Sequence, residues 1–101
     1  MEVHGGRIEG PCTVDRDLAI HGMVAGRATV RPGCTLELRG MVTGDLVVES
    51  GARAEVHGTV SGTVINDGGY VEIHGTVGGV ANTTPASRTV IGREAVVGGQ
   101  A

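Results

Sequence analysis

Histidine and glutamate side chains recur at a fixed spacing and are the residues best suited to chemistry. His57 and His74 each follow a glutamate by two residues, at Glu55 and Glu72. If each pair lies along a strand, neighbouring turns bring the two histidines to about 5 Å, with both carboxylates on the same wet face. Imidazole and carboxylate groups bind zinc, so these four residues are the candidate metal ligands. The interpretation we favour is a solvated ladder in which unlike charges offset one another, with no bound metal.

The sequence lacks the residues that a nucleophilic cysteine site or a phosphate-binding loop would need. Cys12 and Cys34 are the only thiols, and neither has a His/Asp constellation beside it. The glycine-rich stretch 75–79 lacks the lysine and the following helix of a phosphate-binding loop. We therefore predict a protein that is not an enzyme and uses no cofactor. The two cysteines fall in different columns of the repeat described next, so we expect free thiols and a cytoplasmic location.

A six-residue motif recurs along the chain at a nearly constant spacing. Its four copies are His21–Gly26, Arg39–Gly44, His57–Gly62 and His74–Gly79. A weaker copy, Gly6–Gly10, precedes them, and Thr89–Gly92 follows Glu72–Gly75 at the spacing that separates the last two copies. Self-similarity at a period of about 17–18 residues indicates a solenoid whose turns are single repeats.

Small or apolar residues occupy every second position within each repeat, which predicts strands with one buried face. The inward positions recur at every sixth residue and are Val24, Val30, Leu36, Val42, Val48, Ala54 and Val60. Val24, Val42, Val60 and Val77 should stack as one inner ladder. In the turn that starts at Val71, the same alternation places Gly79 and Ala81 inside. Glycines at two fixed columns are expected at corners, where no Cβ fits.

Three corners in each repeat leave three short sides, so the predicted fold is all-β, a triangular parallel β-helix (β-solenoid). We expect five to six turns of about 17–18 residues. They form a single domain, 1–101, with a regular repeat over about 4–80 and a less regular C-terminal turn over 81–101. A right-handed winding is favoured over a left-handed one, because in the central turns the glycine follows the aliphatic residue by two positions. Left-handed hexapeptide helices place the glycine directly after the aliphatic residue.

Composition narrows the range of partners. All eight basic residues are arginine and the formal net charge is −3, so no basic cluster is available for nucleic acid. No apolar run is long enough for direct membrane insertion. Phe and Trp are absent and Tyr70 is the only aromatic residue, so the core must be built from aliphatic side chains.

The ends of the repeat are the surfaces expected to associate. The repeat starts near His4 and runs to about Gly99 without a helix that could cover either end. Uncapped turns present open strand edges, so we expect contact with other copies of the chain. The apolar residues expected there are Val3, Ile8, Val14, Val90, Ile91, Val96 and Val97. Alternatively, the loop at 83–88 folds over the last turn and blunts it.

Two segments, Leu46–Gly62 and Val71–Gly79, resemble bactofilins, the bacterial polymer-forming cytoskeletal proteins, and the resemblance extends over roughly 18–80. It implies a right-handed β-helix that polymerises end to end without nucleotide and acts as a scaffold near the envelope. Relative to the family, we expect almost no flanking tails and no membrane-targeting segment, and the sequence has no Phe near residue 101.

Three functions are compatible with these features. The favoured one is a non-enzymatic scaffold that forms homo-oligomers or filaments. The second is a small module that binds another protein through a flat outer face. The third is a hexapeptide-helix enzyme, such as an acyltransferase or a carbonic anhydrase, which would have its site at clefts between subunits.

Overall fold

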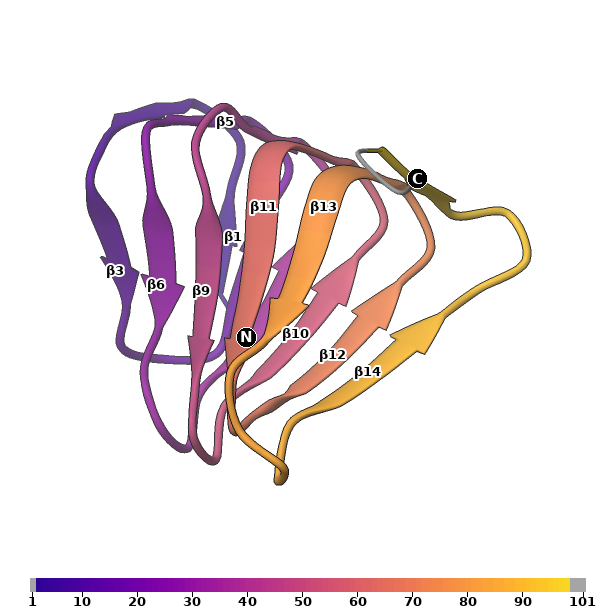
Figure 1. Ribbon diagram of the computed structural model, residues 1–101. Coiled ribbons are helices and arrows are strands. Elements are labelled where there is room, and N and C mark those ends of the chain that lie inside the picture. Colours follow the sequence, from indigo (N-terminus) through magenta and orange to yellow (C-terminus); the bar gives the residue numbers. More distant parts are fainter. Residues whose placement is uncertain (1, 99–101) are drawn as a thin grey trace.

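The computed structural model describes residues 2–98 and contains strands and turns, with no helix and so no membrane-spanning helix in that range. Met1 and residues 99–101, including Gly99 of the predicted repeat, lie outside the described residues. The named strands pair in parallel and wind into a solenoid with three sides (Figure 1).

Each side takes one strand segment from each turn. The first side is β1 (Glu2–His4), β4 (Leu18–Ile20), β7 (Thr35–Leu38), β10 (Arg53–Val56), β12 (Tyr70–Ile73) and β14 (Arg88–Ile91). The second is β2 (Arg7–Glu9), β5 (Met23–Ala25), β8 (Met41–Val42), the starts of β11 (Thr59–Asp67) and β13 (Thr76–Asn82), and β15 (Val96–Val97). The third is β3 (Cys12–Val14), β6 (Ala28–Val30), β9 (Leu46–Glu49) and the later parts of β11 and β13. The predicted all-β solenoid in one domain is confirmed.

The strand directions in Figure 1 give the winding of the chain. Strands β3, β6 and β9 run downward in front, strands β10, β12 and β14 run upward behind them, and successive turns advance to the right. This path is a right-handed helix, as expected. The register in the centre is constant, because Leu18 pairs with Leu36 and Leu36 pairs with Ala54 at the same spacing.

The inner ladder lies where the alternation predicted it. Val24, Val42, Val60 and Val77 are paired in register from turn to turn and are at most 1% exposed. The residues predicted at every sixth position are all buried in the same core. Each buried valine contributes about 1.5–3 kcal/mol relative to an exposed one, and a turn gains this only from its neighbours.

The glycine column at the first corner is required by close stacking of the backbone. A Cβ on Gly40, Gly58 or Gly75 would overlap the carbonyl oxygen of the glycine one turn earlier. None of the three has a positive φ, so their backbone conformations suit any residue and the missing Cβ is the reason for glycine.

The inward assignment of Gly79 and Ala81 was wrong. The strand β13 is one residue short relative to β11, with a register shift between Val60 and Thr63. Gly79 therefore pairs with Thr63, and Val80 occupies the inward column and packs on the core. Ala81 aligns with outward-facing Ile65 instead. A one-residue deletion exchanges the two faces of a strand from that point on.

The alignment of the last turn was also one residue off. Ile73 pairs with Ile91, whereas the motif had aligned it with Val90. Val90 therefore points outward. Gly92, which the motif had aligned with Gly75, is instead equivalent to His74 of the preceding turn. Its N–H donates to the Ile73 carbonyl oxygen at 2.7 Å.

Candidate functional site

Four of the seven apolar residues predicted at the ends are well exposed. Val3 is 64% exposed, Val90 46%, Ile91 47% and Val96 57%. Ile8 and Val97 are half-buried against the core. Val14 is 1% exposed, so its side chain fills the core and only its strand lies at the edge.

The C-terminal end exposes the inner aliphatic columns themselves. Ile91 continues the column of Leu38, Val56 and Ile73, which are fully buried. It is 47% exposed because no further described turn covers it. Among the described residues, strand β14 pairs with β12 alone, so its other edge carries backbone groups free to pair with another strand.

The N-terminal end is open as well but less apolar. Within residues 2–98, strand β1 pairs only with β4. Val3 lies opposite Ala19 on the outside of the first side. His4 lies opposite Ile20, and thus a polar, exposed residue begins the column that ends with Ile91. The two ends therefore differ in chemistry, and the C-terminal end is the more hydrophobic surface.

The loop after β13 does not cover the last turn. It turns a corner and is tied to the preceding turn: the Ser87 hydroxyl donates to the Asn66 carbonyl oxygen at 2.7 Å, and the Thr83 N–H donates to the same oxygen at 3.0 Å. Asn66 is fully buried and donates from Nδ2 to the Arg88 carbonyl oxygen at 2.7 Å. The exposure of Ile91 and Val96 shows that the alternative of a blunted end is wrong.

The predicted histidine column is present on the outside of the first side. The rings of His57 and His74 are stacked, with centroids 5.2 Å apart. His57 Nε2 lies 3.5 Å from Glu55, and His74 Nε2 lies 3.5 Å from Glu72. His74 Nδ1 lies 2.8 Å from Glu94 Oε1, a contact that the sequence did not predict.

The four candidate metal ligands are thus neighbours along a flat column. Each imidazole lies beside its own glutamate, as the charge ladder predicts. Within residues 2–98 no group of three or more His, Cys, Asp or Glu side chains is arranged to hold a metal ion.

The two thiols are free and half-buried. Burial, with a smaller effect of the Asp15 carboxylate, raises the pKa of Cys12, so the thiol form is favoured over the nucleophilic thiolate. Cys34 Sγ lies 3.8 Å from the Pro32 carbonyl oxygen.

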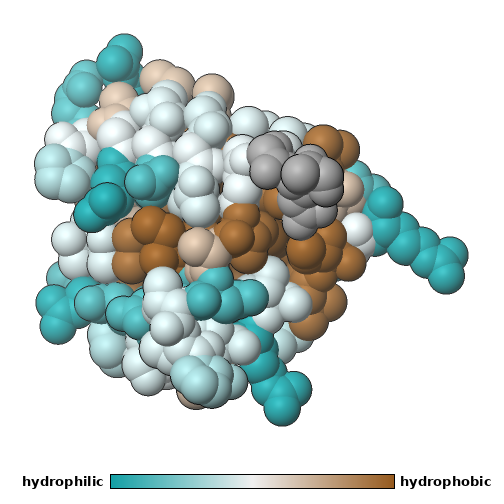
Figure 2. Space-filling view, viewed as in Figure 1, coloured by the Kyte–Doolittle hydropathy of each residue, from teal (hydrophilic) through white to brown (hydrophobic). Residues whose placement is uncertain are grey.

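A half-exposed apolar stripe crosses the third side. Val47, Ile65 and Ala81 are paired in register on the outer surface and are each half-buried. Figure 2 shows brown apolar surface across this face, bordered by teal polar residues. The alternation in the sequence did not mark this outer column as apolar.

The sequence also did not single out a column formed by Arg53, Tyr70 and Arg88, which are paired in register at the start of the first side. The available signal was that an arginine stands one repeat before the only aromatic residue and another stands one repeat after it.

No protein-family model, curated protein or solved structure matches the chain. The likeness to bactofilins therefore depends on the sequence segments Leu46–Gly62 and Val71–Gly79.

Proposed function

We propose that the chain is a non-enzymatic, bactofilin-like scaffold of the bacterial cytoplasm that assembles with copies of itself through its terminal turns. The observation that supports this most strongly is the coincidence of open strand edges and exposed aliphatic side chains at both ends. In the part of the chain that the structure describes, strands β1 and β14 each have one partner, and Val3, Val90, Ile91 and Val96 are exposed beside the terminal strands.

A second copy of the chain is the partner that best fits such an end. Its terminal turn has the same three sides and a similar strand spacing, so its backbone groups can continue the ladder of a parallel or antiparallel sheet. Contact at the C-terminal end would bury Ile91 in the manner of the buried isoleucine Ile73 in the same column. No nucleotide is needed, because hydrophobic burial and backbone hydrogen bonds drive the contact.

The test is light scattering and negative-stain microscopy of the purified protein and of Ile91→Asp. We expect wild-type oligomers or filaments, and a shift of the association midpoint by about 100-fold in the variant, since a charge would have to be buried in the contact. Met41→Asp is the matched control, because Met41 is 36% exposed but lies on a central turn. A wild-type protein that stays monomeric at high concentration and at every salt level would contradict the proposal.

The apolar stripe favours a second candidate, a module that binds another protein through its third side. Flat surfaces with an apolar centre and a polar rim are typical of protein interfaces. Arg27–Asp45 and Arg31–Glu49 ion pairs lie on the strands and corners of this side. A partner that co-purifies in equal amount, is lost in Ile65→Asp, and leaves no filaments would favour this function over assembly.

A further inference from the structure

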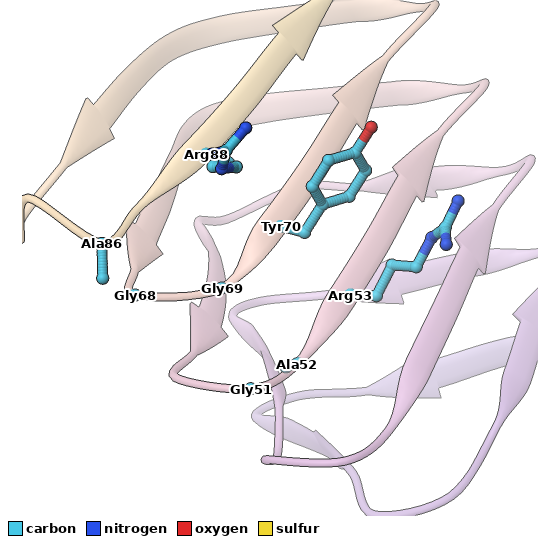
Figure 3. A pocket seen from close by; sticks show the side chains of 8 residues that line it. All are labelled: Gly51, Ala52, Arg53, Gly68, Gly69, Tyr70, Ala86 and Arg88. Atoms are coloured by element: carbon cyan, nitrogen blue, oxygen red, sulfur yellow. The ribbon is translucent and has the colours of Figure 1, made fainter.

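An open hollow of about 360 Å³ lies on the outside of the first side, where strands β10, β12 and β14 begin (Figure 3). Its lining residues are mostly small, with one aromatic ring and two arginines: Gly51, Ala52, Arg53, Gly68, Gly69, Tyr70, Ala86 and Arg88. The hollow exists because three corner glycines and two alanines leave the surface beside the Tyr70 ring unfilled. Its volume is within the range of small-ligand sites.

The ring of Tyr70 is held in place from one side by Arg53. The Arg53 guanidinium lies 5.2 Å from the ring centroid, and its Nη2 is 2.9 Å from Glu72 Oε2. Its Nε is 3.7 Å from Glu55 Oε2. Two carboxylates thus neutralise the charge of Arg53. The arginine lines one side of the hollow and packs against the Tyr70 ring.

Arg88 stands on the other side of Tyr70, on the next strand (Figure 3). It is exposed, and in the described part of the chain no carboxylate is paired with it. The hollow therefore combines an unpaired guanidinium, an aromatic ring and an apolar floor within one turn spacing of about 5 Å.

We propose that this hollow binds a carboxylate carried on a small apolar body, with Arg88 pairing with the carboxylate and the body lying against Tyr70. A guanidinium binds a carboxylate with two parallel hydrogen bonds, which one arginine can supply alone. A phosphate monoester carries up to two negative charges, which a single guanidinium would neutralise only in part. The site includes Arg88 on the terminal strand β14, but binding there does not require self-assembly.

The test is an NMR titration of the intact protein with 3-phenylpropionate, with 3-phenylpropanol as the neutral analogue of the same body. Tyr70 is the only tyrosine and Phe and Trp are absent, so its ring gives signals that are easily assigned. We expect saturable shifts of the Tyr70 ring and of the Gly68 and Gly69 amides, with a dissociation constant of about 1 mM. The alcohol should bind at least about tenfold more weakly, because it cannot form the charged pair.

A second titration, with a peptide, asks whether the bound carboxylate belongs to a protein C-terminus or to a free small acid. N-acetyl-glycyl-phenylalanine and its C-terminal amide are compared under the same conditions. If the peptide acid binds at least about tenfold more tightly than 3-phenylpropionate, the site recognises a protein C-terminus, and equal affinities assign it to free small acids.

Arg88→Gln provides the decisive variant and should weaken binding by about tenfold, while Arg93→Gln, on the same terminal turn but outside the hollow, should leave it unchanged. Circular dichroism checks that each variant keeps its strands. Tyr70→Leu keeps an apolar wall without the ring and should weaken binding severalfold, as read from the Gly68 and Gly69 amides. Shifts that do not saturate by about 10 mM, ten times the expected constant, or equal binding by wild type and Arg88→Gln, would overturn the proposal.

Discussion

The central turns and the last turn of this solenoid are stabilised in different ways. In the centre, glycines lie against the backbone of the preceding turn and the inner aliphatic side chains are completely buried. In the last turn, paired residues on the second side are further apart in the sequence than in the centre, because Thr76 pairs with Thr59 on one side and with Val96 on the other. Val90, Ile91 and Val96 are left exposed there.

Side-chain hydrogen bonds hold the last turn where packing does not. Asn66 binds the Arg88 carbonyl oxygen, and His74 binds Glu94. The consequence is a turn that stays in register while its aliphatic side chains remain available to another molecule. An end of this kind suits association, because its backbone is ordered before the partner arrives and less entropy is lost on binding.

The largest contrast should appear at two glycines. Gly58→Ala places a Cβ onto the Gly40 carbonyl oxygen and should lower the free energy of unfolding by about 3 kcal/mol. The nearest atoms to a Cβ on Gly92 belong to the exposed side chains of His74 and Glu94, which can move, so Gly92→Ala should change the free energy of unfolding by less than about 1 kcal/mol. Urea denaturation followed by circular dichroism measures both. Equal effects would mean that the last turn is stacked as tightly as the centre.

Two valines of one ladder give the next contrast. Val60 and Val97 both pair with Val77, but Val60 is buried and Val97 is half-buried. Val60→Ala should destabilise by about 2.5 kcal/mol, through lost burial and a residual cavity. Val97→Ala should have less than about 1 kcal/mol of effect in the monomer. If Val97→Ala destabilises the protein more strongly at high protein concentration than at low concentration, the last turn is buried by self-association.

The central turns were predictable from the sequence because three independent signals agree there. The alternation, the glycine columns and the six-residue spacing all place Val24, Val42 and Val60 inside. The failures begin at Gly78–Gly79, where two adjacent glycines fit the motif in two registers. Glycine has no side chain to report which face it occupies, so the missing residue of β13 could not be located.

The site at the ends was predicted only in part, for a related reason. The apolar character of Val90 and Ile91 was visible, but whether they are exposed depends on how the loop 83–87 packs. That packing is decided by Asn66, which in the sequence looks like an ordinary turn residue before Asp67 and Gly68. Its burial and its hydrogen bond to the distant Arg88 arise only when the turns stack.

Replacing Asn66 should weaken the last turn more than the centre. Asn66→Ala removes the acceptor of the Gly69 N–H and the donor to the Arg88 carbonyl oxygen, both close to the core. We expect a loss of about 2 kcal/mol, since buried backbone groups lose their partners. Asn82→Ala is the matched control, because exposed Asn82 accepts one hydrogen bond, from the Thr89 hydroxyl. Hydrogen exchange that speeds up equally in β7 and β14 would contradict a local role.

The smallest contrast should be the response to pH, which acts on the last turn through His74 and Glu94. The hydrogen bond with Glu94 raises the pKa of His74 above its ordinary 6.5. A hydrogen bond from its own backbone N–H, and then His74, lower the pKa of Glu94 below 4.5. The contribution of His74 is complete below pH 6.5 and is lost as the pH rises through the raised pKa. That of Glu94 is complete above pH 4.5 and is lost as the pH falls through the lowered pKa.

The last turn should therefore be held best between pH 4.5 and 6.5, while the central turns, where aliphatic packing dominates, change little. Heteronuclear NOE values of the backbone amides from Arg93 to Val97 across this range measure the effect. Glu94→Gln removes one carboxylate and should lower the pKa of His74 and flatten the response above pH 6.5. Should the variant keep the wild-type profile, the stacked His57 ring and Glu72, which also face His74, would be the groups that control its titration.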